Sequence, residues 1–407
     1  MSCWDRPPAR PLFEPALLGS ERVGVGKQIA ILGSTGSIGT NTVDVVRALG
    51  PEYRVTGLSA SRRWRELAEQ SREVGATVVA IADPAHAGAI RPLLKNGTEL
   101  LVGPQGLVEL ARRPDNDFVV AAIVGAAGLE STIAAVAQGK TVGLANKEAL
   151  VVAGSIIIPL AKRTGARLLP IDSEHSAVFQ AMASGVPAEV YKIYLTASGG
   201  PFRTWSGEQM AKATLEDALR HPTWNMGPKI TIDSATMMNK ALEIVEAAWL
   251  FDLKPDSIEV VIHPESIIHS MVEFCDGSVM AQLGAPDMRT PIQYALTWPQ
   301  RQVGVARRLD FATLRRLNFE PPDFERFPAL KMGFEVAAAG GTAGAVLNAA
   351  NEAAVEAFQH RQIPFGKIVE LTRRVLDRHT VESSPDLETL LEADRWARRE
   401  VAACLKR

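Results

Sequence analysis

The segment IAILGSTGSIG, residues 29–39, places three glycines directly after a short apolar run. Such a run is typical of a buried strand, and the glycines allow a tight turn into a helix. In nucleotide-binding sheets the backbone of this turn approaches a pyrophosphate, which lies at the positive N-terminus of the helix. The spacing here is GxxGxxG, so a purely structural strand-to-helix turn is the alternative.

The sequence continues the same pattern up to residue 171. Short apolar runs alternate with segments of helical periodicity, and the distances between the runs suit crossover helices. This alternation predicts an α/β fold, with a Rossmann-like, doubly wound parallel sheet formed by residues 28–171. The predicted strands are residues 29–32, 53–58, 77–82, 118–124, 141–145 and 166–171.

The pattern changes near residue 190, where strands follow one another with shorter connections. We predict a second, central α+β domain at residues 172–298. Its predicted strands are residues 191–196, 229–233, 258–263, 267–274 and 278–283, and its predicted helices are residues 237–251 and 288–298.

The remaining segments are recognised by their composition. Residues 1–27 are rich in proline and arginine and lack hydrophobic periodicity, which predicts a disordered extension. Residues 299–322 are polar and rich in arginine, and we expect a linker there. Residues 323–407 carry mostly helical periodicity and predict a small C-terminal helical domain.

The overall composition is that of an ordinary soluble globular protein. The chain has 407 residues, of which 46% are hydrophobic and 22% charged, with a formal net charge of -2. This charge gives no sign of a nucleic-acid or membrane surface. Three scattered cysteines are too few for a disulfide framework, so we expect a reducing, cytoplasmic location.

The end of the second predicted strand indicates which dinucleotide would bind. Ser61, Arg62 and Arg63 follow it, where NAD-binding sheets usually carry an acid for the ribose 2′-hydroxyl. Positive charge favours a 2′-phosphate and hence NADPH, although a solvated helix start is the alternative. Asn146 and Lys147 follow another predicted strand at the same sheet edge, where we expect them to contact cofactor or substrate.

Two carboxylates, Asp172 and Glu174, follow the predicted strand at residues 166–171. On extended chain they project to one side, while Ser173 between them faces away. Neighbouring carboxylates repel unless a cation or a shared proton joins them, and Mg²⁺ and Mn²⁺ prefer such oxygen ligands. The pair therefore predicts part of a metal site. The alternative is a helix that begins near Ser176, with Asp172 or Ser173 as its cap and Glu174 in its first turn.

A third acid and several phosphate-binding groups occur further along the chain. On a helix that starts near residue 236, Asn239, Lys240 and Glu243 cluster on one face. Glu243 could complete the metal site, whereas Asn239, Lys240 and Ser234 suit a phosphate. Ser198, in a glycine-rich loop after a strand, could bind the same phosphate. An ordinary surface pair of Lys240 with Glu243 is the alternative.

The proline-bracketed loop at residues 221–228 contains His221, Trp224 and Met226. Large side chains in a loop are poorly placed for a core, so the loop predicts a lid over a ligand. A loop docked on its own domain is the alternative. His263 and His269 lack the HExxH spacing of a zinc site, and we expect them to be strand and core residues.

Taken together and in order, six motifs resemble the 1-deoxy-D-xylulose 5-phosphate reductoisomerase family. The resemblance extends from about residue 28 to the C-terminus. The motifs are GSTGSIG at 33–39, NKE at 146–148, DSEH at 172–175, SGGPF at 198–202, HPTWNMG at 221–227 and DSATMMNKALE at 233–243.

This resemblance implies an oxidoreductase of non-mevalonate isoprenoid biosynthesis, on the methylerythritol phosphate route. The implied reaction rearranges and reduces 1-deoxy-D-xylulose 5-phosphate to 2-C-methyl-D-erythritol 4-phosphate. The implied cofactors are NADPH and one divalent cation, which could be Mg²⁺, Mn²⁺ or Co²⁺. A homodimer is also implied, with residues 172–298 serving dimerisation as well as catalysis.

The resemblance also implies roles for individual residues. The implied metal ligands are Asp172, Glu174 and Glu243, and these three with Lys147 and His221 form the implied catalytic set. The implied substrate-binding residues are Lys147, Ser173, Glu174, Ser198, His221, Trp224, Ser234, Asn239, Lys240 and Glu243. The implied NADPH-binding residues are Thr35, Gly36, Ser37, Ile38, Ser61, Arg62, Arg63, Asn146, Glu148, Met226 and Gly227.

The chain departs from the family pattern at residues 60–63, which read Ala-Ser-Arg-Arg in place of Ala-Gly-Lys-Asn. The positive charge is kept, so we expect the NADPH preference to remain, but which side chain holds the 2′-phosphate stays open. Two alternatives also stay open: another NADPH-dependent sugar-phosphate oxidoreductase, or a non-catalytic NADPH-binding regulator.

Overall fold

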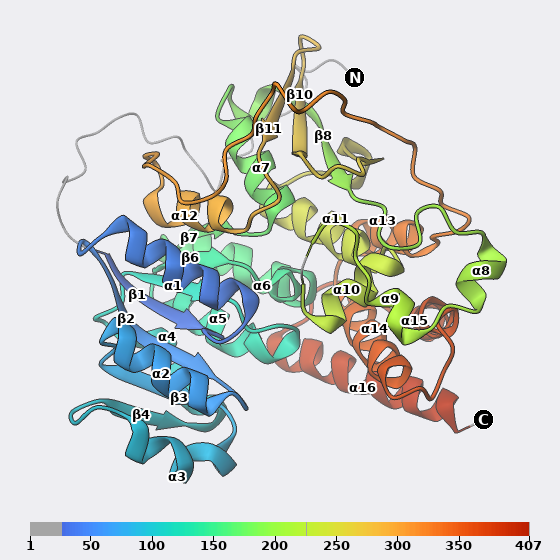
Figure 1. The fold of residues 1–407 in the computed structure, drawn as a ribbon. Helices are drawn as coiled ribbons and strands as arrows, with labels where there is room; N and C mark the ends of the chain where they lie inside the picture. The colour runs from blue at the N-terminus through green and yellow to red at the C-terminus, as the bar shows by residue number, and fades with distance from the viewer. Residues whose placement is uncertain (1–26, 225, 407) are drawn as a thin grey trace.

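The computed structural model describes residues 27–224 and 226–406 of the chain. Figure 1 shows three regions: a large sheet flanked by helices, a smaller sheet, and a group of helices near the C-terminus. The predicted disordered extension lies outside the described residues, apart from Lys27, which begins the first strand. No described helix has both the length and the apolarity that are needed to cross a membrane.

The first region is a seven-stranded parallel sheet in the order β4-β3-β2-β1-β5-β6-β7. Its strands are β1 (Lys27–Leu32), β2 (Tyr53–Ala60), β3 (Val78–Ile81), β4 (Glu99–Val102), β5 (Phe118–Ala121), β6 (Thr141–Leu144) and β7 (Arg167–Pro170). All six predicted strands are present. The short edge strand β4 was missed because four residues give too little pattern. The strand order reverses between β1 and β5, where open α/β sheets bind ligands at the strands' carboxyl ends.

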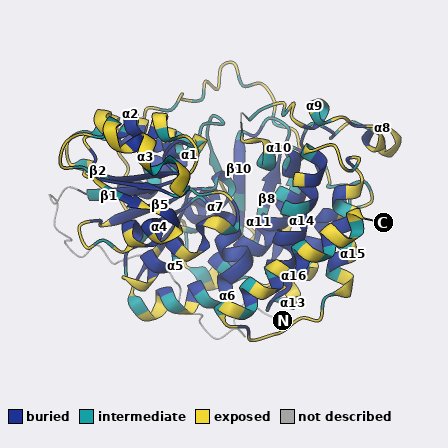
Figure 2. Ribbon diagram, turned by 90° about the horizontal axis from the view of Figure 1, so that it is seen from below, coloured by how far each residue is buried: buried dark blue, intermediate teal, exposed yellow. Residues whose placement is uncertain are grey.

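Helices cover both faces of this sheet, as predicted for a doubly wound fold. In Figure 2, α1, α2 and α3 lie on one side of the strands, and α4, α5 and α6 lie on the other. Their bounds are α1 (Ser37–Leu49), α2 (Trp64–Val74), α3 (Ala87–Ile90), α4 (Gly103–Arg112), α5 (Leu129–Ala137) and α6 (Lys147–Thr164).

The second region is built on a four-stranded sheet in the order β11-β10-β8-β9. Only β8 and β9 pair in parallel, whereas β10 pairs antiparallel with β8 and β11. The strands are β8 (Val190–Ala197), β9 (Ile258–Ile262), β10 (Ile268–Phe274) and β11 (Val279–Leu283). The associated helices are α7 (Ser173–Met182), α8 (Gly207–Ala211), α9 (Leu215–Ala218), α10 (Pro228–Ala235), α11 (Met238–Leu250) and α12 (Arg289–Thr297).

One predicted strand of this region is wrong, because residues 229–233 lie in helix α10. The β-branched run Ile230-Thr231-Ile232 resembles a strand, but proline at the first helical position favours a helix start. Lys229 and Asp233 then form an ion pair of 2.9 Å one turn apart on the same helix face.

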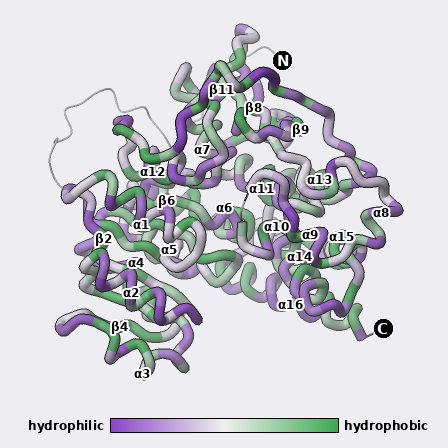
Figure 3. Tube along the Cα trace, in the orientation of Figure 1, coloured by the Kyte–Doolittle hydropathy of each residue, from purple (hydrophilic) through white to green (hydrophobic). Residues whose placement is uncertain are grey.

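The third region consists of α13 (Ala329–Ala339), α14 (Ala343–Gln359), α15 (Lys367–Arg378) and α16 (Leu387–Leu405), which confirms the predicted C-terminal helices. The described residues 299–328 that lead to it form no helix or strand, apart from one bridge of Glu320 to Ile262. This segment is mostly purple, hence hydrophilic, in Figure 3.

Helix α11 joins the regions, because it is buried on nearly all sides. Met238, Leu242 and Val245 pack in one apolar cluster with residues of α6, α13 and α14. The strands and this helix form the dark blue centre of Figure 2. Polar side chains of α11 are therefore held among these helices, next to strands β8 and β9 of the smaller sheet.

Candidate active site

One cavity collects residues from every segment that the sequence motifs mark. It is lined at the start of α1, α6 and α7, by the loop after β8, and by α10 and α11. The predicted site residues that line it are Ser37, Ile38, Lys147, Asp172, Ser173, Glu174, Ser198, His221, Trp224, Met226, Gly227, Ser234, Asn239, Lys240 and Glu243. The predicted residues outside this lining are Thr35, Gly36, Ser61, Arg62, Arg63, Asn146 and Glu148.

Three carboxylates converge in the cavity. Asp172 immediately precedes α7 and Glu174 lies in its first turn, so the predicted extended geometry is wrong. The alternative, a helix start, is right, although the helix begins at Ser173 and not near Ser176. The Asp172 side chain nevertheless makes no capping hydrogen bond. Instead, oxygens of Asp172, Glu174 and Glu243 lie within 4.8 Å of one another.

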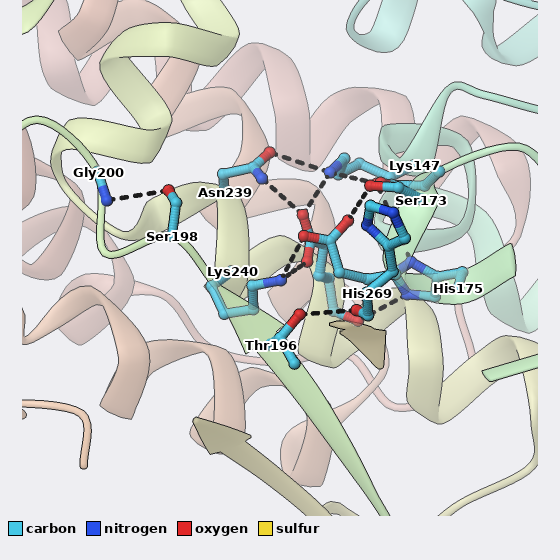
Figure 4. A network of polar contacts seen from close by, with 12 residues as sticks. Lys147, Ser173, His175, Thr196, Ser198, Gly200, Asn239, Lys240 and His269 are labelled. Carbon is cyan, nitrogen blue, oxygen red and sulfur yellow. Dashed lines mark hydrogen bonds and ion pairs between the residues drawn. The ribbon is translucent and has the colours of Figure 1, made fainter. Parts of the chain in front are cut away.

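Two lysines neutralise part of this charge. Figure 4 shows Lys147 and Lys240 pointing into the carboxylate cluster. Lys147 Nζ pairs with Asp172 and lies 2.9 Å from Glu243 Oε1, and Lys240 Nζ pairs with Glu243 and lies 3.0 Å from Glu174 Oε1. Burial alone would lower the pKa of both ammonium groups, but the carboxylates outweigh it and raise both pKa values.

The donor set fits a hard divalent cation. It offers oxygen ligands only, from three carboxylates whose formal charge exceeds that of the two lysines. Asp172, Glu174 and Glu243 are the residues that would hold such an ion. A second group of possible ligands, Asp172, His175 and Glu246, shares Asp172, but only the all-oxygen group has all three of its members in the lining of the cavity.

A second buried layer lies behind the carboxylates and was missed from the sequence. His175 Nε2 lies 3.0 Å from the backbone oxygen of Glu243, so this nitrogen donates, and Nδ1 faces Glu246 Oε2 at 3.4 Å. Burial raises the pKa of Glu246 well above its usual value and lowers that of His175. The only available signal was the position of Glu246, one helical turn after Glu243.

The other side of the cavity presents hydrogen-bond donors. His221 Nδ1 accepts from the backbone N–H groups of Thr223 at 3.1 Å and Trp224 at 2.9 Å. The proton is therefore on Nε2, which donates to Ser198 Oγ at 3.0 Å. The backbone N–H of Gly200 also donates to Ser198 Oγ at 3.1 Å. With its oxygen accepting twice, the Ser198 hydroxyl has its proton available for a ligand anion.

The glycine turn after β1 provides a cradle for a nucleotide. Gly33 has a φ of 86°, and a Cβ on it would lie 2.6 Å from the backbone oxygen of Ala122. Helix α1 begins at Ser37 without a side-chain cap, so its first N–H groups are left for a ligand. Ser37 and Ile38 line the cavity. The residues present thus fit the pyrophosphate of a dinucleotide.

Other predicted cofactor residues lie around this turn. Arg62 and Arg63 are exposed just before α2, on the β2 side of the turn. Asn146 is buried, where it caps α6 and donates to the backbone oxygens of Ile123 and Gly125. Glu148 is buried beside Lys229. Direct contacts of these residues with a cofactor stay predictions.

The loop at residues 221–228 lines the cavity with His221, Trp224, Met226 and Gly227, and its role as a lid stays a prediction. The Trp224 ring lies against the ring of His269 on β10, with centroids 6.1 Å apart. His263 and His269 are buried, as predicted. Lining residues that the sequence did not reveal are mostly apolar: Ala145, Ala197, Ile230, Met237 and Met288, together with Gly199. An apolar residue that lines a cavity cannot be distinguished by its type from one in the hydrophobic core, so the sequence did not indicate these positions.

Three sequence profiles match consecutive parts of the chain. The 1-deoxy-D-xylulose 5-phosphate reductoisomerase profile matches residues 29–154, its C-terminal domain profile matches residues 168–251, and the DXP reductoisomerase C-terminal domain profile matches residues 283–400. The chain belongs to the 1-deoxy-D-xylulose 5-phosphate reductoisomerase family.

Whole-chain relatives of this family agree. The chain is 52% identical to the reductoisomerase of Pelotomaculum thermopropionicum over 91% of its own length and 97% of the relative. It is 50% identical to that of Symbiobacterium thermophilum, over 91% and 97% of the two chains.

Solved structures of the family superpose closely on the chain. The Zymomonas mobilis reductoisomerase in complex with NADPH matches with a TM-score of 0.87 and 45% identity, over 93% of this chain and 99% of that one. A reductoisomerase in complex with NADPH, fosmidomycin and magnesium matches with a TM-score of 0.90 and 41% identity, over 93% and 98%.

Proposed function

We propose that this reductoisomerase converts 1-deoxy-D-xylulose 5-phosphate and NADPH, with one proton, into 2-C-methyl-D-erythritol 4-phosphate and NADP⁺. The observation that carries the proposal is the shared cavity. The uncapped start of α1, the three carboxylates and the Ser198 hydroxyl all face one space. A sugar phosphate held there would meet a dinucleotide and a divalent cation at once.

Each wall of the cavity has a separate task in this reaction. Ser198, Ser234, Asn239 and Lys240 bind the substrate phosphate, remote from the reacting carbons, and so orient the substrate. Lys147 and Ser173, next to the carboxylates, contact the oxygens of the carbon skeleton.

The cofactors complete this arrangement. Asp172, Glu174 and Glu243 hold the cation, and the turn at residues 33–39 with Met226 and Gly227 holds NADPH. When bound, the cation supplies Lewis acidity to the rearranging ketone and hydroxyl, and NADPH supplies the hydride for the resulting aldehyde. His221 and Trp224 lie on the loop that shields the reacting groups from water. Exclusion of water strengthens the charge interactions inside the site.

Three finer proposals accompany this function. Mn²⁺ or Co²⁺ could replace Mg²⁺, since the all-oxygen donor set does not select strongly among them. A homodimer is supported by the exposed edge strand β11, which carries Val279 and Met280 at 48% and 40% exposure. A cytoplasmic location agrees with the small number of cysteines.

Identification of the product tests the proposal. Purified protein is incubated with 1-deoxy-D-xylulose 5-phosphate, NADPH and Mg²⁺, and the product is identified by nuclear magnetic resonance. We expect a branched-chain polyol phosphate in a one-to-one ratio with the NADPH consumed, and no product after removal of the metal with a chelator. Reduction without rearrangement would instead favour a different sugar-phosphate oxidoreductase, and binding without turnover a regulator.

A further inference from the structure

Lys229 lies where three parts of the chain meet. It is in the first turn of α10, directly after the loop at residues 221–228 and two residues after Gly227. Its Nζ is 2.8 Å from Glu148 Oε1 on α6 and 2.9 Å from Asp233 Oδ2 on α10. Asp233 Oδ1 in turn accepts a hydrogen bond of 2.8 Å from Asn351 on α14. One ammonium group thus links the cofactor region, the central region and the C-terminal helices.

This junction is buried and consists of ionisable side chains. The side chains of Lys229, Glu148 and Asp233 are 18%, 6% and 1% exposed. Burial opposes the charge on Lys229, but Asp233, Glu148 and Glu352 outweigh it and raise its pKa above the usual range. Burial would likewise raise the pKa of Glu148, but Lys229 lowers it. Removal of the ammonium group would leave two buried carboxylates without their cation.

The ion pair of Lys229 with Glu148 also connects two walls of the cavity. Glu148 directly follows Lys147, which lines the cavity at the start of α6. Lys229 follows Met226 and Gly227, which line it at the end of the loop. The contact of Lys229 with Glu148 therefore holds these two walls together. Each member of the ion pair is at most three residues along the chain from the lining residues that it positions.

We propose that Lys229 is a positioning residue: through Glu148 it holds the end of the loop, Met226 and Gly227, against the NADPH-binding region. This inference rests on the proposed function, because it assigns the bound nucleotide as NADPH. Lys229 does not line the cavity itself and acts on the nucleotide through the two segments that it joins.

A double-mutant cycle tests the inference. Lys229→Met, Glu148→Gln and the double variant are compared with the wild type for NADPH affinity, measured by fluorescence without substrate, and for kcat and KM. We expect Lys229→Met to weaken NADPH binding at least about tenfold, the scale of a broken buried charge pair. In the Glu148→Gln background the same change should weaken it by less than about threefold, because coupled residues are not additive.

Two further variants separate positioning from general stability. Lys229→Arg retains the charge, and we expect it to restore most of the NADPH affinity. Lys192→Met removes another lysine–glutamate pair, Lys192 Nζ to Glu259 Oε2 at 2.8 Å on the central sheet, and should leave NADPH affinity unchanged. If Lys229→Met does not fold, Lys229→Gln replaces it in the cycle, because its amide can still donate to a carboxylate.

The outcomes distinguish this inference from the proposed function. Wild-type affinity for NADPH in folded Lys229→Met, or equal losses in both backgrounds, would overturn the positioning role while leaving the function intact. A wild-type protein that neither binds NADPH nor turns over substrate would overturn the proposed function itself.

Discussion

His221 supports Ser198 through a neutral imidazole, and its titration can be observed directly. Burial lowers the pKa of His221 from 6.5 to about 4. Between these pH values His221 is protonated in the unfolded chain but neutral in the folded chain. The free energy of unfolding therefore falls as the pH falls from 6.5 to about 4. We expect the His221 ring signal in nuclear magnetic resonance, assigned with His221→Gln, to titrate near pH 4. A midpoint near 6.5 would contradict the half-buried, neutral ring.

Gly200 is the second residue on which the phosphate side depends. Its φ is 68°, and a Cβ would lie 2.4 Å from the backbone oxygen of Ser234. Gly200→Ala should therefore displace the N–H that holds Ser198 and raise the KM for the sugar phosphate roughly tenfold or more, as misplaced binding groups do. Steady-state kinetics check this. Gly207→Ala, in the same segment with open space around it, is the control. Equal KM values for both variants would contradict the expectation.

The positions of the three acids in the candidate site were predictable at this scale. Asp172, Glu174 and Glu243 are acids at informative spacings, and the structure brings them together as predicted. Lys229 and Glu246 were missed, because their partners Glu148 and His175 come from other elements far away in the sequence. Sequence spacing reveals contacts within one turn or strand, whereas these pairs arise only from packing.

At the scale of elements, the contact between α6 and α14 decides how the C-terminal helices dock. A Cβ on Gly344 of α14 would lie 2.0 Å from the backbone oxygen of Val151 on α6. We expect Gly344→Ala to lower the free energy of unfolding by about 1–3 kcal/mol, since overpacking forces the backbones apart. Urea denaturation measures this change. Gly366→Ala, where no heavy atom lies within 4 Å, should have little effect, and equal stabilities would contradict the close docking.

The strands of the large sheet were predicted well because buried parallel strands read as continuous apolar runs between glycine turns. The prediction failed where local pattern and tertiary context disagree. Ile230-Thr231-Ile232 has the composition of a strand, yet Pro228 and the pairing of Lys229 with Asp233 support a helix. Strand β4 has only four residues, of which only Leu101 is buried, so its sequence shows no period that could have predicted a strand.

At the scale of the whole molecule, the open edge of β11 predicts assembly. Val279 and Met280 are exposed on an edge strand, and such edges usually pair or are covered. We expect a homodimer by light scattering after size exclusion, and a shift toward monomer in the double variant Val279→Lys, Met280→Lys. Val381→Lys, at a similar exposure in the C-terminal region, is the control. A monomeric wild type would contradict the assembly.

The central claim is that three carboxylates from two elements form one metal site in the cavity that receives NADPH and the sugar phosphate. The most direct test is NADPH oxidation with 1-deoxy-D-xylulose 5-phosphate, with and without Mg²⁺, in the wild type and in Glu243→Gln. We predict turnover that requires Mg²⁺ and falls at least about a hundredfold in the variant, while NADPH still binds, because the lost ligand stabilises charge in the reaction. Turnover that does not need the metal, or a fully active Glu243→Gln, would contradict the account.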